Sequence, residues 1–120
     1  MATEYKIKRR LQRYRCDAGV QVQQESIKAG FWGKVSDISL GGCYVSTFAP
    51  LPAGKGVCLL IQAKENQIIV SGRTVTSHPG VGMGIAFSEQ KAKSAEQCLQ
   101  AFITQLAGRT GQHDAVNVLR

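Results

Sequence analysis

Short apolar segments separated by glycine, proline and polar turns make up the chain between residues 20 and 87. Within them apolar and polar side chains alternate, a pattern typical of strands buried on one face. The alternation predicts six strands, at residues 20–24, 31–38, 43–48, 57–63, 68–76 and 81–87. In the second of these the alternation is imperfect, because the apolar residues Val35 and Ile38 lie at an odd and an even position and would point to opposite faces.

The periodicity changes after residue 87. From about residue 90 to residue 106, apolar side chains recur at helical spacing and form one stripe: Ala95, Leu99, Phe102, Ile103 and Leu106. Ser88 fits an N-cap, and Gly108 fits the residue that follows a helix. Six strands and one helix predict a mainly β protein, a six-stranded antiparallel β-barrel with a C-terminal α-helix packed against it.

The chain has 120 residues, enough for one domain with a substantial core. We expect a basic arm over residues 1–15, a barrel with its helix over residues 16–107, and a tail over residues 108–120. The apolar runs are too short to span a bilayer, and no apolar region follows the basic N-terminus as in a secretory signal. A cytoplasmic location is therefore expected.

Cysteine and histidine spacing gives no indication of a metal or cofactor. The cysteines, at positions 16, 43, 58 and 98, form no C-x-x-C pair, and His78 and His113 lie in no ligand pattern. We expect reduced cysteines that are mostly buried as small apolar side chains.

Positive charge is concentrated at the start of the chain. Residues 1–15 carry six basic side chains against Glu4 alone, which accounts for +5 of the formal net charge of +7. This asymmetry favours an anionic partner that binds one end of the molecule. A solvated basic tail is equally compatible with the composition alone.

A second polar stretch, Asp37-Ile38-Ser39-Leu40-Gly41-Gly42, interrupts the strand pattern. Its aspartate can accept paired hydrogen bonds from a guanine edge, its serine can donate to a phosphate, and its glycines allow backbone to approach an anion. Taken alone, the stretch is better explained as an ordinary turn between two strands. Arginine binds phosphate or guanine O6 and N7 bidentately, and Arg9 and Arg13 are spaced to face one ligand.

Together, the two stretches resemble the PilZ domain family, whose signature is R-x-x-x-R followed by [D/N]-x-S-x-x-G. Arg9-x-x-x-Arg13 and Asp37-x-Ser39-x-x-Gly42 match it, and the stretches at residues 72–73 and 82–87 extend the resemblance over about residues 7–106. The resemblance implies a barrel that binds the bacterial second messenger cyclic di-GMP. The binding residues that it implies are Arg9, Arg10, Arg13, Asp37, Ser39, Gly41 and Gly42.

By this resemblance, Arg9 and Arg13 would bind guanine Hoogsteen edges and phosphates, and Arg10 would stack on a base. Asp37 and Ser39 would bind the other side of a guanine and its phosphate. The implied function is a cyclic di-GMP receptor that has no cofactor, changes conformation on binding and signals to a protein partner.

Three other functions fit the sequence less well. A small basic barrel that binds nucleic acid fits the charge, but Tyr14, Trp32 and Tyr44 are scattered rather than paired for base stacking. We expect Trp32 to pack beneath the turn at residues 37–42 or in the core. An enzyme is disfavoured because the sequence has no paired-carboxylate motif and no nucleophile beside a histidine. A PilZ-fold interaction module without ligand is disfavoured by the intact motifs.

Overall fold

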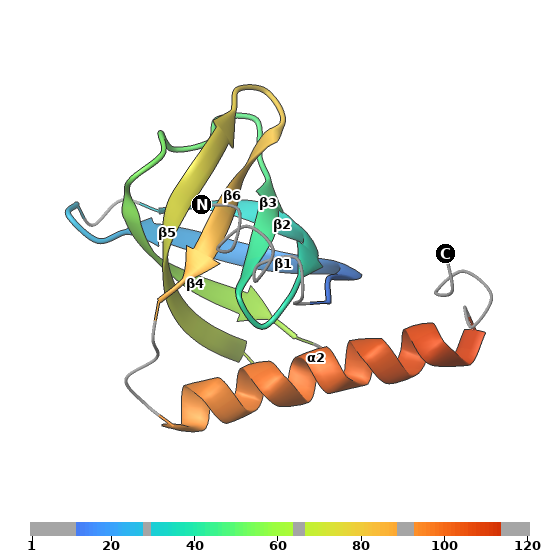
Figure 1. Ribbon diagram of the computed structural model, residues 1–120. Coiled ribbons are helices and arrows are strands. Elements are labelled where there is room, and N and C mark those ends of the chain that lie inside the picture. The colour runs from blue at the N-terminus through green and yellow to red at the C-terminus, as the bar shows by residue number, and fades with distance from the viewer. Residues whose placement is uncertain (1–11, 28–29, 64–66, 89–92, 114–120) are drawn as a thin grey trace, which may run out of the picture.

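Six antiparallel strands close into a barrel in the computed structural model (Figure 1), which describes residues 12–27, 30–63, 67–88 and 93–113. The strands are β1 (Tyr14–Gln24), β2 (Gly30–Ile38), β3 (Gly42–Ser46), β4 (Gly56–Gln62), β5 (Gln67–His78) and β6 (Gly82–Phe87). Their order around the barrel is β1-β2-β3-β6-β5-β4, and pairing of β4 with β1 closes it. The predicted barrel is confirmed.

Alternate residues of each strand fill the interior. Val57, Leu59 and Ile61 of β4 are fully buried, and Leu59 and Ile61 pair with Val22 and Val20 of β1. Successive side chains of a strand point to opposite faces, so the residues between these inward ones lie on the outer face of the barrel. The candidate site lies on that outer face.

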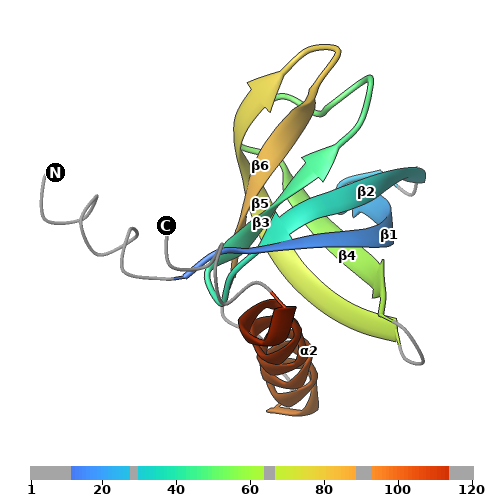
Figure 2. The same ribbon diagram turned by 90° about the vertical axis from the view of Figure 1, so that its right-hand side faces the viewer.

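The helix α2 (Lys93–His113) lies under the barrel in both views (Figures 1 and 2) and contacts β1 and β5. Its apolar stripe joins the core, with four side chains buried: Leu99, Phe102, Ile103 and Leu106. The predicted packing of the helix against the barrel is thus confirmed. In the part of the chain that the structure describes, no helix is long and apolar enough to cross a membrane.

The helix continues beyond Gly108, where we predicted its end, and reaches His113. Glycine commonly follows a helix because it adopts a positive φ. Among the described glycines, however, only Gly54 and Gly80 have positive φ. Gly108 is therefore an interior residue of the helix, and the prediction was wrong because glycine's preference for helix ends does not prevent it from lying inside a helix.

Replacement of Gly108 by alanine is expected to raise the free energy of unfolding by about 0.5–1 kcal/mol, because alanine has the higher helix propensity. An added Cβ at this position meets no atom within 4 Å. Urea denaturation followed by circular dichroism would measure the change. The matched control is Gly54→Ala, whose Cβ is equally unobstructed but whose φ of 93° an L side chain rarely adopts, so it should destabilise. A destabilised Gly108→Ala variant would contradict the helical assignment.

The first strand begins at Tyr14, six residues before the predicted start at residue 20, inside the segment expected to be an arm. Arg15 and Asp17 are both exposed, which the outer face of a barrel strand permits. The sequence pattern missed this part of β1 because its charge was taken to exclude a strand. The remainder of the predicted arm, with Arg9 and Arg10, and the tail from residue 114 lie outside the described residues.

Trp32 is 62% exposed, contrary to the prediction that it packs beneath the turn at residues 37–42 or in the core. Its neighbour Phe31 has the opposite parity on β2 and packs against the core instead. With Phe48 and Val81, which are also exposed, Trp32 lines an open hollow on the outer surface.

All four cysteines are free, and the prediction that most are buried holds only in part. Cys43 is buried, which raises the pKa of its thiol, whereas Cys98 on α2 is exposed. Cys16 is half-buried; its thiol donates to the carbonyl of Val35 at 3.3 Å, and burial raises its pKa to about 11. The Cys16 and Cys43 thiols therefore stay protonated at neutral pH and act as packing groups.

Candidate binding site on the outer face of the barrel

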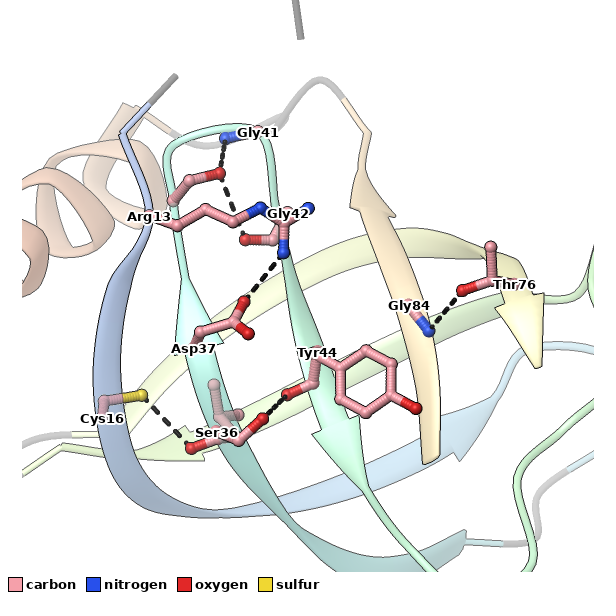
Figure 3. A network of polar contacts seen from close by, with 11 residues as sticks. Arg13, Cys16, Ser36, Asp37, Gly41, Gly42, Tyr44, Thr76 and Gly84 are labelled. Carbon is pink, nitrogen blue, oxygen red and sulfur yellow. Dashed lines mark hydrogen bonds and ion pairs between the residues drawn. The ribbon is translucent and has the colours of Figure 1, made fainter. Parts of the chain in front are cut away.

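An ion pair joins the basic N-terminal stretch to the stretch that begins at Asp37. Arg13 Nη1 donates to Asp37 Oδ1 at 2.8 Å, across 24 residues of sequence (Figure 3). Pairing of β1 with β2 brings them together, since Tyr14 lies opposite Ile38 and Arg15 lies opposite Asp37. The arginine side chain is 64% exposed and the carboxylate 32% exposed, so a ligand in solvent can reach both.

Irregularities in β1 and β2 place these side chains on the outer face. The β2–β3 register shifts between Val35 and Asp37, and the β1–β2 register shifts between Arg15 and Ala18. Because of the β2 irregularity, Val35 and Ile38 are both fully buried although their parities differ, and Asp37 remains accessible. Bulges of this kind are frequent beside functional sites, where they redirect a side chain.

A tight turn follows Asp37 and connects β2 to β3. The Ser39 N–H donates to the Gly42 carbonyl at 2.8 Å, and the Ser39 hydroxyl donates to the same carbonyl at 3.4 Å. The same hydroxyl accepts a hydrogen bond from the Gly41 N–H at 3.0 Å. Ser39 is 4% exposed, so in this structure its hydroxyl holds the turn, as the simpler interpretation of this stretch expected.

Close packing against β6 leaves room only for a glycine at position 42. It pairs with Ala86, and an added Cβ would overlap the carbonyl oxygen of Ile85. The obstructing atoms all belong to the backbone, which cannot move aside as a side chain can. The carbonyl of Gly41 also accepts a hydrogen bond from the Phe87 N–H at 2.9 Å. The turn is therefore fixed to β6 as well as to β2.

The strand register sets a row of residues across the outside of the barrel, which we call the outer row. From β1 to β5, successive pairs in the register give Arg15, Asp37, Tyr44, Gly84 and Thr76. The row combines a cation, a carboxylate and an aromatic ring, the groups that bind the phosphates, edges and faces of nucleotides.

Asp37 is the residue of this row that was predicted to bind a ligand, and Tyr44 is its aromatic residue, which was not among the predicted site residues. Cys43 and Val45 on either side of it are buried, so alternation places Tyr44 on the outer face. This signal was present in the sequence. Its position beside Asp37, however, depends on the β2–β3 register.

The predicted site residues divide into three groups. Arg13 and Asp37 are in direct contact, and the turn residues Ser39, Gly41 and Gly42 adjoin them. Arg9 and Arg10 lie outside the described residues. In the described part of the chain, no group of three or more histidine, cysteine, aspartate or glutamate side chains is placed to hold a metal ion.

The family model of the PilZ domain matches residues 7–105, which include both sequence stretches and the barrel. The chain belongs to the PilZ domain family. No curated protein matches its sequence.

Solved structures share the fold. The PilZ domain with c-di-GMP of YcgR from Escherichia coli is 14% identical, with a TM-score of 0.71 over 90% of this chain and 98% of that one. The PilZ domain of CeSA from a cellulose-synthesizing bacterium is 21% identical, with a TM-score of 0.60 over 81% and 96%. The Bacillus subtilis inhibitor of motility MotI/DgrA is 23% identical, with a TM-score of 0.63; the match covers 84% of this chain but only 52% of that longer one.

Proposed function

We propose that this protein is a receptor for cyclic di-GMP. The observation that carries the proposal is the contact between Arg13 and Asp37, which joins the two motifs of the family at one accessible place on the barrel. The matches to the PilZ family model and to a PilZ domain described with c-di-GMP support it.

Each group has a chemical role in the proposal. Asp37 accepts hydrogen bonds from the N1–H and N2–H₂ edge of a guanine, and the planar fork of Arg13 donates to guanine O6 and N7 or to a phosphate. Arg9 and Arg10 add positive charge from the segment before β1. Ser39, Gly41 and Gly42 hold the turn that borders the ligand, which bears two phosphates and is attracted to a basic site.

We infer that ligand binding changes the conformation at the start of β1. The ligand's guanine and phosphate groups compete for both members of the Arg13–Asp37 pair, so binding rearranges the contact between them. The proposed receptor catalyses no reaction. It would therefore act through a protein partner that binds the altered surface. Free cysteines are consistent with action in the reducing cytoplasm.

Calorimetric titration of the protein with cyclic di-GMP, cyclic di-AMP and GTP tests the proposed function. Binding of cyclic di-GMP alone is expected. Adenine in cyclic di-AMP lacks the N1–H and N2–H₂ groups that donate to Asp37, and GTP has the guanine edge but only one guanine and no cyclic phosphodiester. Similar affinity for all three, falling steeply with added salt, would instead favour the nucleic-acid-binding alternative. Absence of heat with all three nucleotides at high concentration would contradict the receptor function.

A further inference from the structure

Tyr44 lies at the centre of the outer row, opposite Asp37 on β2 and opposite Gly84 on β6. Figure 3 shows its ring on the same face as Asp37 and Arg13, directed across β6. The Cβ atoms of residues directly opposite each other on adjacent antiparallel strands are about 5 Å apart. A planar group bound at Asp37 is therefore within reach of the Tyr44 ring.

Two contacts fix the Tyr44 ring. Its hydroxyl lies 3.0 Å from Nδ1 of His78, which pairs with Gly82 on the neighbouring strand. On its inner side the ring lies against Gly82, where an added Cβ would come within 2.6 Å of Tyr44 Cε2. Glycine at position 82 thus allows the ring to lie close to β6. An aromatic ring that is already fixed loses little conformational freedom when a base stacks on it.

On β6, the residue of the outer row next to Tyr44 is small. Gly84 has no side chain, and its N–H donates to the Thr76 hydroxyl at 3.1 Å, so that hydroxyl is engaged within the barrel wall. The outer row therefore begins with charged side chains at Arg15 and Asp37, continues with the Tyr44 ring, and ends with Gly84 and Thr76, which are small and uncharged.

From this arrangement we propose that Tyr44 is the stacking platform for the guanine whose edge Asp37 binds. The proposal rests on the proposed function and adds a residue outside both sequence motifs. Asp37 recognises the guanine edge in the plane of the base, whereas Tyr44 contacts the face of the base. Stacking on an aromatic ring strengthens binding with little dependence on base identity. Asp37 thus supplies selectivity, and Tyr44 supplies affinity.

Calorimetric titration of Tyr44→Ala, Tyr44→Leu and Tyr44→Phe with cyclic di-GMP tests this role, with Arg13→Ala measured alongside. Loss of the ring in the alanine and leucine variants is expected to weaken binding about tenfold or more. The phenylalanine variant keeps the ring and should stay within about threefold of the wild type. The matched control is Phe48→Ala, which removes an aromatic side chain that is 86% exposed and lies off the outer row, and should leave affinity unchanged.

The outcomes separate this inference from the proposed function. If Tyr44→Ala binds as the wild type does while Arg13→Ala binds weakly, the stacking role is overturned and the receptor function stands. If the wild type does not bind cyclic di-GMP, both are overturned. Should Tyr44→Ala fail to fold, leucine and phenylalanine variants of equal affinity would refute stacking. In the bound wild type, the Tyr44 ring proton resonances should move upfield under the ring current of the base, and unchanged resonances at saturation would also refute it.

Discussion

Replacement of Arg13 by alanine is expected to weaken cyclic di-GMP binding at least about thirtyfold, which corresponds to about 2 kcal/mol. In the proposed complex Arg13 makes charged hydrogen bonds to the ligand, and the alanine variant would lose them. The cost to stability should stay below about 1 kcal/mol, because the Arg13–Asp37 pair is solvent-exposed and such pairs contribute little. Calorimetry would measure affinity, and thermal denaturation would show that the variant is folded.

A matched control for this variant lies on β2. Lys34→Ala also removes one positive charge from an exposed ion pair, in this case with Asp17 at 3.2 Å. Lys34 lines the hollow beside Trp32 rather than the outer row, so its loss should change affinity by less than about threefold. Equal weakening in the two variants would show that the ligand responds to net charge and not to a site at Arg13.

Replacement of Gly42 by alanine is expected to lower the free energy of unfolding by about 2–3 kcal/mol, because the new Cβ overlaps the Ile85 carbonyl and forces β3 away from β6. In a domain of this size the corresponding fall in Tm is roughly 10 °C. Differential scanning calorimetry would measure it.

Gly19→Ala provides the comparison, since a Cβ at residue 19 of β1 meets nothing within 4 Å. That variant should be as stable as the wild type within about 0.5 kcal/mol. A Gly42→Ala variant of unchanged Tm would mean that the family's glycine is not required for packing of the turn on β6, and would direct attention to a role in ligand contact.

The barrel was predictable because the alternation of apolar and polar side chains indicates which face of each strand is buried. Five of the six strands begin and end within two residues of the predicted positions. The first strand was shortened in the prediction because the segment that ends at Arg15 has too much charge for a core element, although the outer face of a barrel tolerates charged side chains. The helix was placed by its apolar stripe, but a single glycine did not determine its end.

The site was predictable only in part, for a different reason. The motifs named Arg13 and Asp37, but their contact depends on β1 starting at Tyr14 and on the two register shifts. One of these register shifts left a sign in the sequence, since the apolar residues Val35 and Ile38 do not follow the alternation of a regular strand. Cross-strand neighbours such as Asp37 and Tyr44 depend on register, which no local pattern specifies.

In the proposed complex, cyclic di-GMP binds along the outer row at the Arg13–Asp37 pair. Titration of ¹⁵N-labelled protein with cyclic di-GMP, followed through its assigned amide resonances, tests it most directly. We predict that the largest shift changes fall on Arg13, on the turn from Asp37 to Gly42, and on Tyr44, while amides around Trp32 and Phe48 stay unchanged. Saturable changes confined to the hollow at Trp32 and Phe48, with none at Arg13 or Asp37, would contradict the account.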